Sequence, residues 1–409
     1  TQITMHAEDC PPLNYTPAPS AWAFCLHGPP CIGIFIGRWG AWPPLTPLLL
    51  RSLSANKAVD FLILSDTSPS PLVPLPPNVH LFLSSLEAFT AKLQCAVGLK
   101  LRSLSVAKRF SGTNQFASKD AARYSAAKTN DLKPMWGEAF ESDLLRGFEW
   151  WGYSQEDVFF GQIRECVSEA VLRDADVYTP LRHPFNASGV YMLLRNSRYV
   201  NRLWRQSTDA KAVLSTGRYL VFDEWWGESR DNFPTILGRE ADAGRLKISY
   251  PGAEAISTHP RYSYSHDLDE KHEVLACWKR GRMYVNTDTK ESPMAQLPCL
   301  GVSPYRPREV CLFHALKVKN APAVRGLTFP NYSVPFLTSS VREFSISRLG
   351  VVVHLDWSNR QSLRATLQTS APQATFPAFA IYSASFAAGP RPIGIGAARA
   401  FFEKAISCR

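Results

Sequence analysis

The fold is decided by the stretch Phe148-Glu149-Trp150-Trp151-Gly152-Tyr153-Ser154-Gln155-Glu156-Asp157-Val158-Phe159-Phe160-Gly161. It predicts an aromatic strand that runs into an acidic turn, followed by a second apolar strand that ends at a glycine. Carboxylates next to buried aromatic residues are costly unless a metal, a cation or a backbone amide pairs with them. An acidic turn at the end of a strand often holds a hard cation against phosphate oxygens. The alternative is a solvated surface turn, and this stretch alone leaves both open.

Upstream of this stretch, the chain predicts the start of a parallel sheet. Apolar runs bounded by turn residues predict buried strands over Cys31–Gly37, Val59–Asp66 and Asn78–Leu83. Helical spacing of leucines predicts a helix over 45–56, between the first two strands. Because strand, helix and strand follow one another with short connections, we expect a parallel α/β sheet. The basic segment 85–129 is predicted to be helical.

Downstream, helical and strand patterns alternate up to about residue 314. We predict a polar turn over 130–137, and a strand that enters from the polar loop around Ser188 and Gly189. A hairpin is expected around Arg280 and Gly281. The remaining predictions are helices over 138–145, 162–173, 198–206 and 209–214, and strands over 148–153, 176–179, 190–194 and 309–314.

The 409 residues suffice for one large domain with appendages or for two domains. Residues 1–30 are Pro-rich and predict a leader or stem, whereas 31–320 form the main domain. Residues 321–409 are rich in Ser, Ala and Pro and predict a partly disordered extension. No apolar run is long enough to span a membrane. Because the chain starts at Thr, we expect membrane association only through a segment absent from it.

The net charge of +10 permits nucleic acid, acidic membrane surfaces or phosphorylated ligands as partners. The densest basic region is spread along a predicted helix and is typical of a solvated face, so we expect no nucleic-acid binding. Its members are Lys100, Arg102, Lys108, Arg109, Lys119, Arg123 and Lys128. The nine cysteines are odd in number and contain no CxxC pair, which argues against a disulfide framework or a zinc site.

Several motifs, taken in order, resemble those of a little-characterised family of glycosyltransferase-like proteins with the GT-A fold, related to polysaccharide-synthesis enzymes. The motifs are Ile32–Gly37, Trp42-Pro43-Pro44, Leu50-Arg51-Ser52 with Asn56, Asp60–Asp66, Pro77-Asn78-Val79, Asp131-Leu132-Lys133-Pro134 with Gly137, Trp151-Gly152-Tyr153, Asp157 with Gly161, Ser188-Gly189, Leu194-Arg195-Asn196, Phe222-Asp223-Glu224 and Phe313-His314 with Lys317. They extend over about Cys31 to Lys319. The resemblance implies an α/β, GT-A-like fold: a Rossmann-like, mixed and mostly parallel sheet flanked by helices.

The resemblance also implies transfer of a sugar from a nucleotide-sugar donor to a hydroxyl acceptor on a glycan or polysaccharide, assisted by Mn²⁺ or Mg²⁺. The metal would neutralise charge on the leaving diphosphate from an Asp-x-Asp turn. Asp157 occupies the second acid position of that turn, and Gln155 stands where the family has the first acid. His314 would complete the metal shell or contact the diphosphate; its alternative is a structural histidine. With one negative charge missing, we expect weaker metal binding.

Donor-binding roles are implied for six further positions. Asp66 would contact the base or ribose, unless it caps a turn. Asp131 and Lys133 would orient the donor and diphosphate, unless they form a surface ion pair. Ser188 and Gly189 would let the backbone approach the sugar. Lys317 is included in the same donor-binding set.

The acceptor side is assigned to Asp223 and Glu224, which would contact the hydroxyl, with a general-base role if the reaction inverts. Their alternative is the first turn of a helix, where acids are favoured. The neighbouring Trp225 and Trp226 would stack on an acceptor sugar or pack in the core.

Three function classes remain open at this point. The leading one is a metal-dependent glycosyltransferase, located in the Golgi or another secretory lumen if eukaryotic and in the cytoplasm if bacterial. The second, motivated by Gln155, is a catalytically impaired protein that binds a nucleotide sugar or glycan. The third is a basic nucleic-acid-binding protein.

Overall fold

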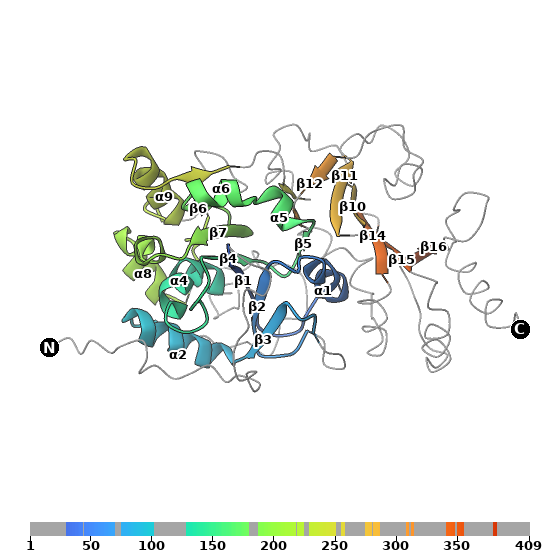
Figure 1. The fold of residues 1–409 in the computed structure, drawn as a ribbon. Helices are drawn as coiled ribbons and strands as arrows, with labels where there is room; N and C mark the ends of the chain where they lie inside the picture. Colours follow the sequence, from blue (N-terminus) through green and yellow to red (C-terminus); the bar gives the residue numbers. More distant parts are fainter. Residues whose placement is uncertain are drawn as a thin grey trace, which may run out of the picture.

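The computed structural model describes residues 30–43, 45–69, 75–101, 128–179, 187–217, 219–224, 229–250, 255–257, 275–279, 281–286, 308–310, 312–314, 341–347, 350–355 and 379–382. A seven-stranded sheet in the order β3-β2-β1-β4-β7-β6-β8 lies at its centre (Figure 1). The strands are β1 (Ile32–Arg38), β2 (Asp60–Ser65), β3 (Val79–Leu83), β4 (Trp150–Ser154), β6 (Val177–Tyr178), β7 (Tyr191–Arg195) and β8 (Ile248–Ser249). Strands β1 to β4 are mutually parallel, and β7 runs antiparallel to both β4 and β6. The predicted mixed, mostly parallel α/β sheet is confirmed.

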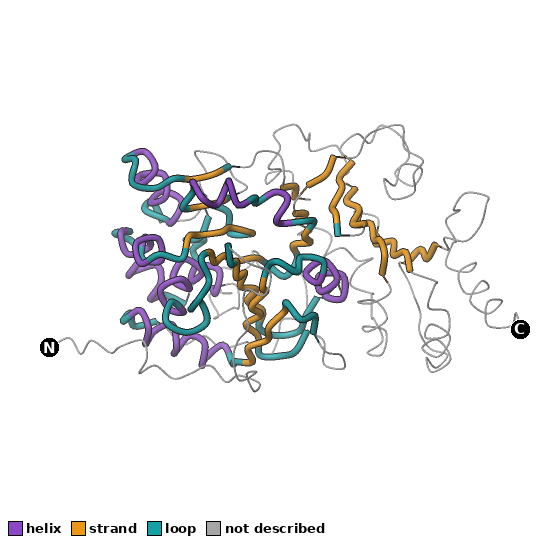
Figure 2. The backbone as a smooth tube through the Cα atoms, in the orientation of Figure 1, coloured by secondary structure: helices purple, strands orange, loops and turns teal. Residues whose placement is uncertain are grey.

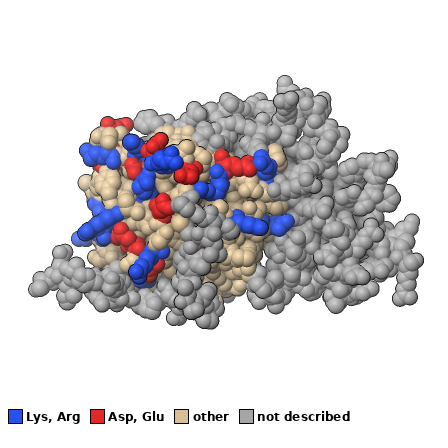
Figure 3. All heavy atoms as spheres, in the orientation of Figure 1, with Lys and Arg blue, Asp and Glu red and all other residues tan. Residues whose placement is uncertain are grey.

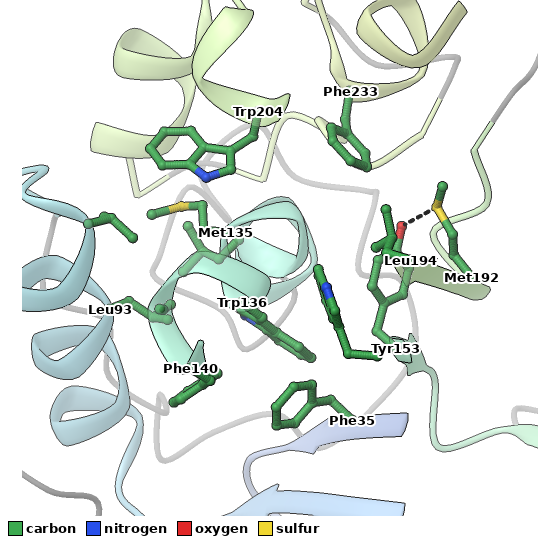
Figure 4. Packing of buried hydrophobic residues seen from close by; sticks show 14 of the residues in the cluster. Phe35, Leu93, Met135, Trp136, Phe140, Tyr153, Met192, Leu194, Trp204 and Phe233 are labelled. Atoms are coloured by element: carbon green, nitrogen blue, oxygen red, sulfur yellow. Dashed lines mark hydrogen bonds between the residues drawn. The ribbon is translucent and has the colours of Figure 1, made fainter. Parts of the chain in front are cut away.

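Both faces of this sheet are buried, which explains why its strands have continuous apolar runs rather than alternating ones. Ile34 and Ile36 of β1 face one apolar cluster, and Phe35 faces the other. Helix α1 (Thr46–Ser54) covers the first face, whereas α2 (Leu86–Val97), α4 (Trp136–Phe140) and α9 (Phe233–Asp242) cover the second (Figure 1). In the second cluster, Phe35 packs edge-on against Trp136 at 5.7 Å (Figure 4).

The predicted polar turn over 130–137 is wrong, because this segment is helical and buried. It forms α3 (Lys128–Leu132), the 3₁₀ helix η2 (Lys133–Met135) and the start of α4. Lys128, assigned to a solvated face, is only 1% exposed. The remaining helices are α5 (Ile163–Cys166), α6 (Glu169–Asp174), α7 (Arg198–Asn201), η3 (Leu203–Gln206) and α8 (Ala210–Ser215).

The helix predicted over 85–129 is shorter where the structure describes it. Helix α2 ends at Val97, and Gly98 follows in the left-handed conformation with φ of 70°. Such a glycine commonly terminates a helix because it has no Cβ to clash in this conformation. At the other end, the Ser85 side chain accepts the Ala88 N–H and caps the helix.

Two further sheets lie beside the central one (Figure 2). A three-stranded sheet contains β5 (Val158–Phe160), β13 (Leu312–His314) and β9 (Ala255–Ser257). A six-stranded sheet contains β12 (Arg308–Val310), β11 (Arg282–Asn286), β10 (Leu275–Lys279), β14 (Val341–Ser347), β15 (Gly350–Leu355) and β16 (Phe379–Tyr382). Strands β10 and β11 form the predicted hairpin. Because β14 pairs with β10, the boundary predicted at residue 320 falls between strands of one sheet.

The six-stranded sheet is attached to β5 through its hairpin. The Trp278 side chain is buried, and its Nε1–H donates to the Phe160 carbonyl at 3.0 Å. Met283 is also buried and belongs to the apolar cluster under α1. Phe160 of β5 also packs against Phe61 of β2, with ring centroids 5.7 Å apart, so this strand contacts both of the other sheets.

Three cysteines, Cys31, Cys95 and Cys166, are disulfide-bonded, which contradicts the prediction that cysteine spacing argues against disulfides. The absence of a CxxC pair therefore did not exclude disulfide bonds in this chain. No helix in the described part of the chain is long and apolar enough to cross a membrane.

The first prediction concerns Asn56, which links α1 to the chain after β5. Its amide donates to the carbonyls of Ser52 (3.0 Å) and Gly161 (2.8 Å), and its oxygen accepts the Ile163 N–H (2.8 Å). Asn56→Ala leaves these buried groups unsatisfied and should lower the free energy of unfolding by about 2–4 kcal/mol, measured by denaturant titration. The exposed neighbour provides the control, since Lys57→Ala should change stability by less than about 0.5 kcal/mol. Equal losses in both variants would contradict this role.

Candidate active site

The acidic turn lies where the connectivity of the central sheet changes direction. From β1 the chain continues to β2 on one side, whereas β4 pairs with β1 on the other side. In open α/β sheets, ligands bind outside the carboxyl ends of the strands at such a point. Arg38 ends β1 and Ser154 ends β4, and the Arg38 guanidinium binds the Glu156 carboxylate at 2.8 Å. The turn therefore adjoins the position where this topology favours a ligand.

The turn is tied to the loop that enters β7. Gln155 donates its backbone N–H to the Val190 carbonyl at 3.1 Å, and its amide Nε2 donates to the Gly189 carbonyl at 3.3 Å. Asp157, two residues later, is only 2% exposed. Its carboxylate is thus withdrawn from solvent, unlike that of a solvated surface turn.

The small sheet brings His314 to this turn. Strand β13 is antiparallel to β5, and its register pairs His314 with Val158, the residue after Asp157. The backbone positions of Asp157 and His314 are therefore adjacent in space, although 157 residues separate them in sequence. Lys317, predicted to bind the donor, lies outside the described residues, as do Trp225 and Trp226.

Lys133 joins the Gly189 loop to a second acidic segment. Its ammonium donates to the Gly189 carbonyl and lies 3.4 Å from Asp223 Oδ2 and 5.2 Å from the centre of the Tyr153 ring. Lys133 is 3% exposed and Asp223 is 0% exposed. The alternative considered for Asp131 and Lys133, a surface ion pair between them, does not hold, because each residue is buried and pairs with another partner.

Gly189 is a glycine because its neighbours occupy the space of a side chain. A Cβ at this position would lie 2.5 Å from both Asp223 Oδ2 and Glu224 Oε1. Glycine therefore lets the loop backbone approach these carboxylate oxygens more closely than a residue with a side chain would. The hydroxyl of the preceding Ser188 accepts the Val190 N–H at 3.2 Å, which stabilises the loop locally.

Asp223 lies in a strongly perturbed electrostatic environment. Burial raises its pKa well above the usual range; the charges of Glu224 and Asp131 act in the same direction, and Lys133 opposes them. Its Oδ1 has no hydrogen-bond partner among the described residues. A buried carboxyl group with a raised pKa is a candidate general base or acid.

The aromatic Tyr153 lies beside these carboxylates. Its pKa is raised by burial and by the charges of Asp223 and Glu224. The hydroxyl donates to the sulfur of Met192 on the neighbouring strand at 3.3 Å (Figure 4). Tyr153 therefore forms one wall of the site and remains protonated there.

Asp131 organises the turn that contains Asp223. Its Oδ2 accepts from Lys128 Nζ at 2.7 Å and from the Leu220 N–H at 2.8 Å, and its Oδ1 accepts the Phe222 N–H at 2.7 Å. The intervening Val221 has a φ of 61°, a rare conformation for a β-branched residue that costs roughly 1–3 kcal/mol. Asp223 and Glu224 thus lie on a strained turn and not in the first turn of a helix.

Lys128 was not predicted as a site residue. A lysine three residues before an aspartate is a helical pairing signal, but Lys128 was assigned to the solvated face of the helix over 85–129 and Asp131 to the polar turn that follows it. Arg38 and Tyr153 were also missed, because they are ordinary residues of strands and only the sheet register brings them to the site.

Asp66 is closer to its structural alternative than to a ligand-binding role. Its Oδ1 accepts the Gly40 N–H at 2.9 Å, and Thr67 Oγ1 donates to the Gly40 carbonyl at 3.3 Å. These bonds connect the loop after β1 to the loop after β2, at the same edge of the sheet. Asp66 therefore shapes this edge through a turn contact.

The possible metal ligands are few within the described side chains. No group of three His, Cys, Asp or Glu side chains is found there. The predicted set consists of the Asp157 carboxylate, the Gln155 amide oxygen and the His314 imidazole, of which the first two side chains are described. Oxygen ligands of this kind suit Mg²⁺ or Mn²⁺.

With this geometry in view, comparison with known proteins identifies the family. Residues 109–320, just over half of the chain, match the Family of unknown function (DUF6625). The chain belongs to this family. No curated protein matches it. Among solved structures, this DUF6625 member is similar to the galactosyltransferase LgtC in complex with donor and acceptor sugar analogs, at 9% identity and a TM-score of 0.34, over 75% of this chain and 95% of that one. At such a TM-score we draw no function from the likeness.

The second prediction concerns the pH dependence of stability of this DUF6625 protein. Because the folded state raises the pKa of Asp223, it retains a proton that the unfolded chain releases above about pH 4. The contribution of Asp223 to stability should therefore fall as pH rises above that value. Asp223→Asn should remove this contribution, so the variant should gain stability relative to the unaltered protein between pH 5 and pH 7.5. Denaturant titrations at both pH values measure it, and an unchanged difference would contradict it.

Proposed function

We propose that this chain is a glycosyltransferase that moves a sugar from a nucleotide-sugar donor to a hydroxyl group on a glycan. The observation that supports it is the convergence of Gln155, Lys133 and Asp223 around the Gly189 loop, at the point where the central sheet changes direction. A buried cation, a carboxyl group of raised pKa and a turn with possible metal ligands meet there. These are the groups that displacement of a nucleoside diphosphate by a hydroxyl requires.

On the donor side, the Lys133 ammonium is positioned to stabilise negative charge in a site withdrawn from water. Asp157 and His314, with the oxygen of Gln155, would hold Mn²⁺ or Mg²⁺ next to it. The metal, when bound, would neutralise the charge that develops on the leaving diphosphate. Glycine at position 189 lets the loop backbone lie directly against the Asp223 and Glu224 carboxyl groups.

On the acceptor side, Asp223 is assigned the general-base role. Its Oδ1 makes no hydrogen bond within the described residues, while its Oδ2 is held near Lys133. A base with a raised pKa takes a proton from an attacking hydroxyl more effectively than an ordinary carboxylate does. Glu224 follows it on the same turn and is assigned to contacts with the acceptor.

The disulfide-bonded cysteines support a secretory location for this reaction. Disulfide bonds persist in oxidising compartments and are rare in the cytosol. Cys31, Cys95 and Cys166 lie at the start of β1, in α2 and at the end of α5, so three separate elements are held in this way. We therefore favour a lumen such as that of the Golgi over the cytoplasm.

One observation favours the second candidate, a protein that binds a nucleotide sugar without turnover. The Gln155 amide nitrogen donates to the Gly189 carbonyl, so this side chain has a structural contact besides any contact with a metal.

Nucleic-acid binding has less support, because basic and acidic side chains intermix on the visible described face (Figure 3). Lys92, Arg202 and Arg205, for example, are paired with carboxylates.

The test of the proposed function is incubation of the purified protein with a panel of nucleotide sugars and glycan acceptors. Release of nucleoside diphosphate, dependent on Mn²⁺ or Mg²⁺ and abolished by EDTA, is the expected result. Binding of a nucleotide sugar without turnover would favour the second candidate. Neither binding nor turnover, together with salt-sensitive retention on nucleic acid, would favour the third.

The third prediction concerns the metal turn. Asp157→Asn removes the only carboxylate of the assigned ligands and should lower metal-dependent turnover by about 100-fold or more. The fold should remain intact, as judged by circular dichroism. Glu169→Gln serves as the control because Glu169 is an exposed carboxylate of α6, and it should keep full turnover. Full turnover by Asp157→Asn would refute the assignment of the turn.

The fourth prediction tests the direction in which Gln155 faces. Gln155→Asp restores the second negative charge of the turn and should tighten Mn²⁺ binding by about tenfold, since charged carboxylates are stronger ligands than amides. Calorimetric titration of the protein with Mn²⁺ measures this without any turnover. Unchanged or weaker Mn²⁺ affinity would mean that position 155 does not face a metal.

A further inference from the structure

The carboxylate of Asp131 is entirely enclosed by protein donors. The side chain is 0% exposed and accepts three hydrogen bonds, from Lys128 Nζ and from the backbone N–H groups of Leu220 and Phe222. Lys128 is itself buried and also donates to the Val213 carbonyl at 2.8 Å, at the end of α8. The Lys128–Asp131 pair therefore connects α3 both to the end of α8 and to the turn over residues 220–222.

The two backbone groups that Asp131 binds lie on either side of Val221. Hydrogen bonds to residues 220 and 222 hold Val221 in its left-handed conformation, which the chain would otherwise leave. The far side of this turn is fixed by α9, because the Phe233 N–H donates to the Phe222 carbonyl at 3.0 Å. Asn232, which caps α9, donates to the Glu224 carbonyl at 3.0 Å. Asp223 therefore lies between Phe222 and Glu224, whose carbonyl groups both accept hydrogen bonds from the start of α9.

The same short segment holds the side chain that faces Asp223. Lys133 follows Asp131 by two residues, and its ammonium lies near Asp223 Oδ2 and the Gly189 carbonyl. Asp131 therefore fixes the backbone of the 220–224 turn, while Lys133 fixes the carboxylate that projects from it. The Oδ1 of Asp223, unpartnered within the described residues, is left as the group available to a ligand.

We infer that Asp131, paired with Lys128, is a positioning residue that holds the Val221 turn and thereby aims the Asp223 carboxyl group. This corrects the expectation that Asp131 contacts the donor, since its oxygens are already bound by the protein. Only one part of the inference, the role of Asp223 in turnover, rests on the proposed function. The contact between Asp131 and the turn stands independently of it.

Two kinds of variant test this role. Asp131→Asn keeps the shape but removes the charge and part of the accepting capacity. Because that variant leaves Lys128 as a buried unpaired cation, the double variant Lys128→Met with Asp131→Asn keeps the test valid if the single variant fails to fold. The control is Lys92→Met with Asp143→Asn, which removes another lysine–aspartate pair that makes no described contact with the 220–224 turn.

The first readout is amide hydrogen exchange of the 219–224 peptide, which requires no activity. Loss of the bonds from Asp131 should accelerate exchange at Leu220 and Phe222 by about tenfold or more, because one neutral acceptor replaces a charged one. The control pair should leave exchange in this peptide unchanged. Unchanged exchange in both Asp131 variants would overturn the inference.

The second readout is the pattern of kinetic effects. A misaimed general base should lower kcat by about 100-fold, while KM for the nucleotide sugar should change by less than about threefold, since the donor contacts remain. In an Asp223→Asn background, the Asp131→Asn change should have almost no further effect on kcat, because both act through one group. A raised KM with unchanged kcat, or additive losses in the double variant, would assign Asp131 to the donor instead.

The two readouts separate this inference from the proposed function. If the unaltered protein turns over no nucleotide sugar, the proposed function fails, and hydrogen exchange alone decides whether Asp131 positions the turn. If turnover is present but exchange does not respond to Asp131, the positioning role fails while the function stands.

Discussion

The buried ammonium of Lys133 is the constraint around which the site is built. A charge that is 3% exposed must be compensated within the protein, and a single salt bridge at 3.4 Å would not suffice. The Gly189 carbonyl and the face of the Tyr153 ring complete its environment. These partners come from β4, the loop before β7 and the turn before α9, so this one cation specifies how three distant segments approach one another.

The same cluster contains features that reduce stability. Asp223 is buried with a raised pKa, Val221 has a positive φ, and Gly189 is approached by two carboxylates. A sequence selected only for stability would replace such groups by apolar ones, whereas strained and electrostatically perturbed groups are typical of functional sites. These features occur together in one buried cluster, whereas the rest of the core is aromatic and apolar.

Much of the fold was predictable because the central strands are continuous apolar runs bounded by turn residues, as in β1 and β2. Lys133, Gly189 and Asp223 were predicted through their motifs, and the structure brings them together. The segment 130–137 was wrongly predicted as a polar turn because Asn130, Asp131 and Pro134 are typical of turns, and only tertiary contacts make it helical. The roles of Lys128 and Asp131 depend on the backbone of residues 220–222, and contacts between residues so distant in sequence cannot be predicted from the local sequence.

The pairing of β5 with β13 has a consequence for the synthesis of this protein. The acidic turn leaves the ribosome well before the strand that ends in His314, since 157 residues separate them. At a synthesis rate of roughly 5–20 residues per second, this strand is made about 8–30 s after the turn. The hairpin that covers the Phe160 carbonyl through Trp278 emerges within the same interval. In a nascent chain, the pairing of β5 with β13 therefore forms only once almost the whole central fold has been made.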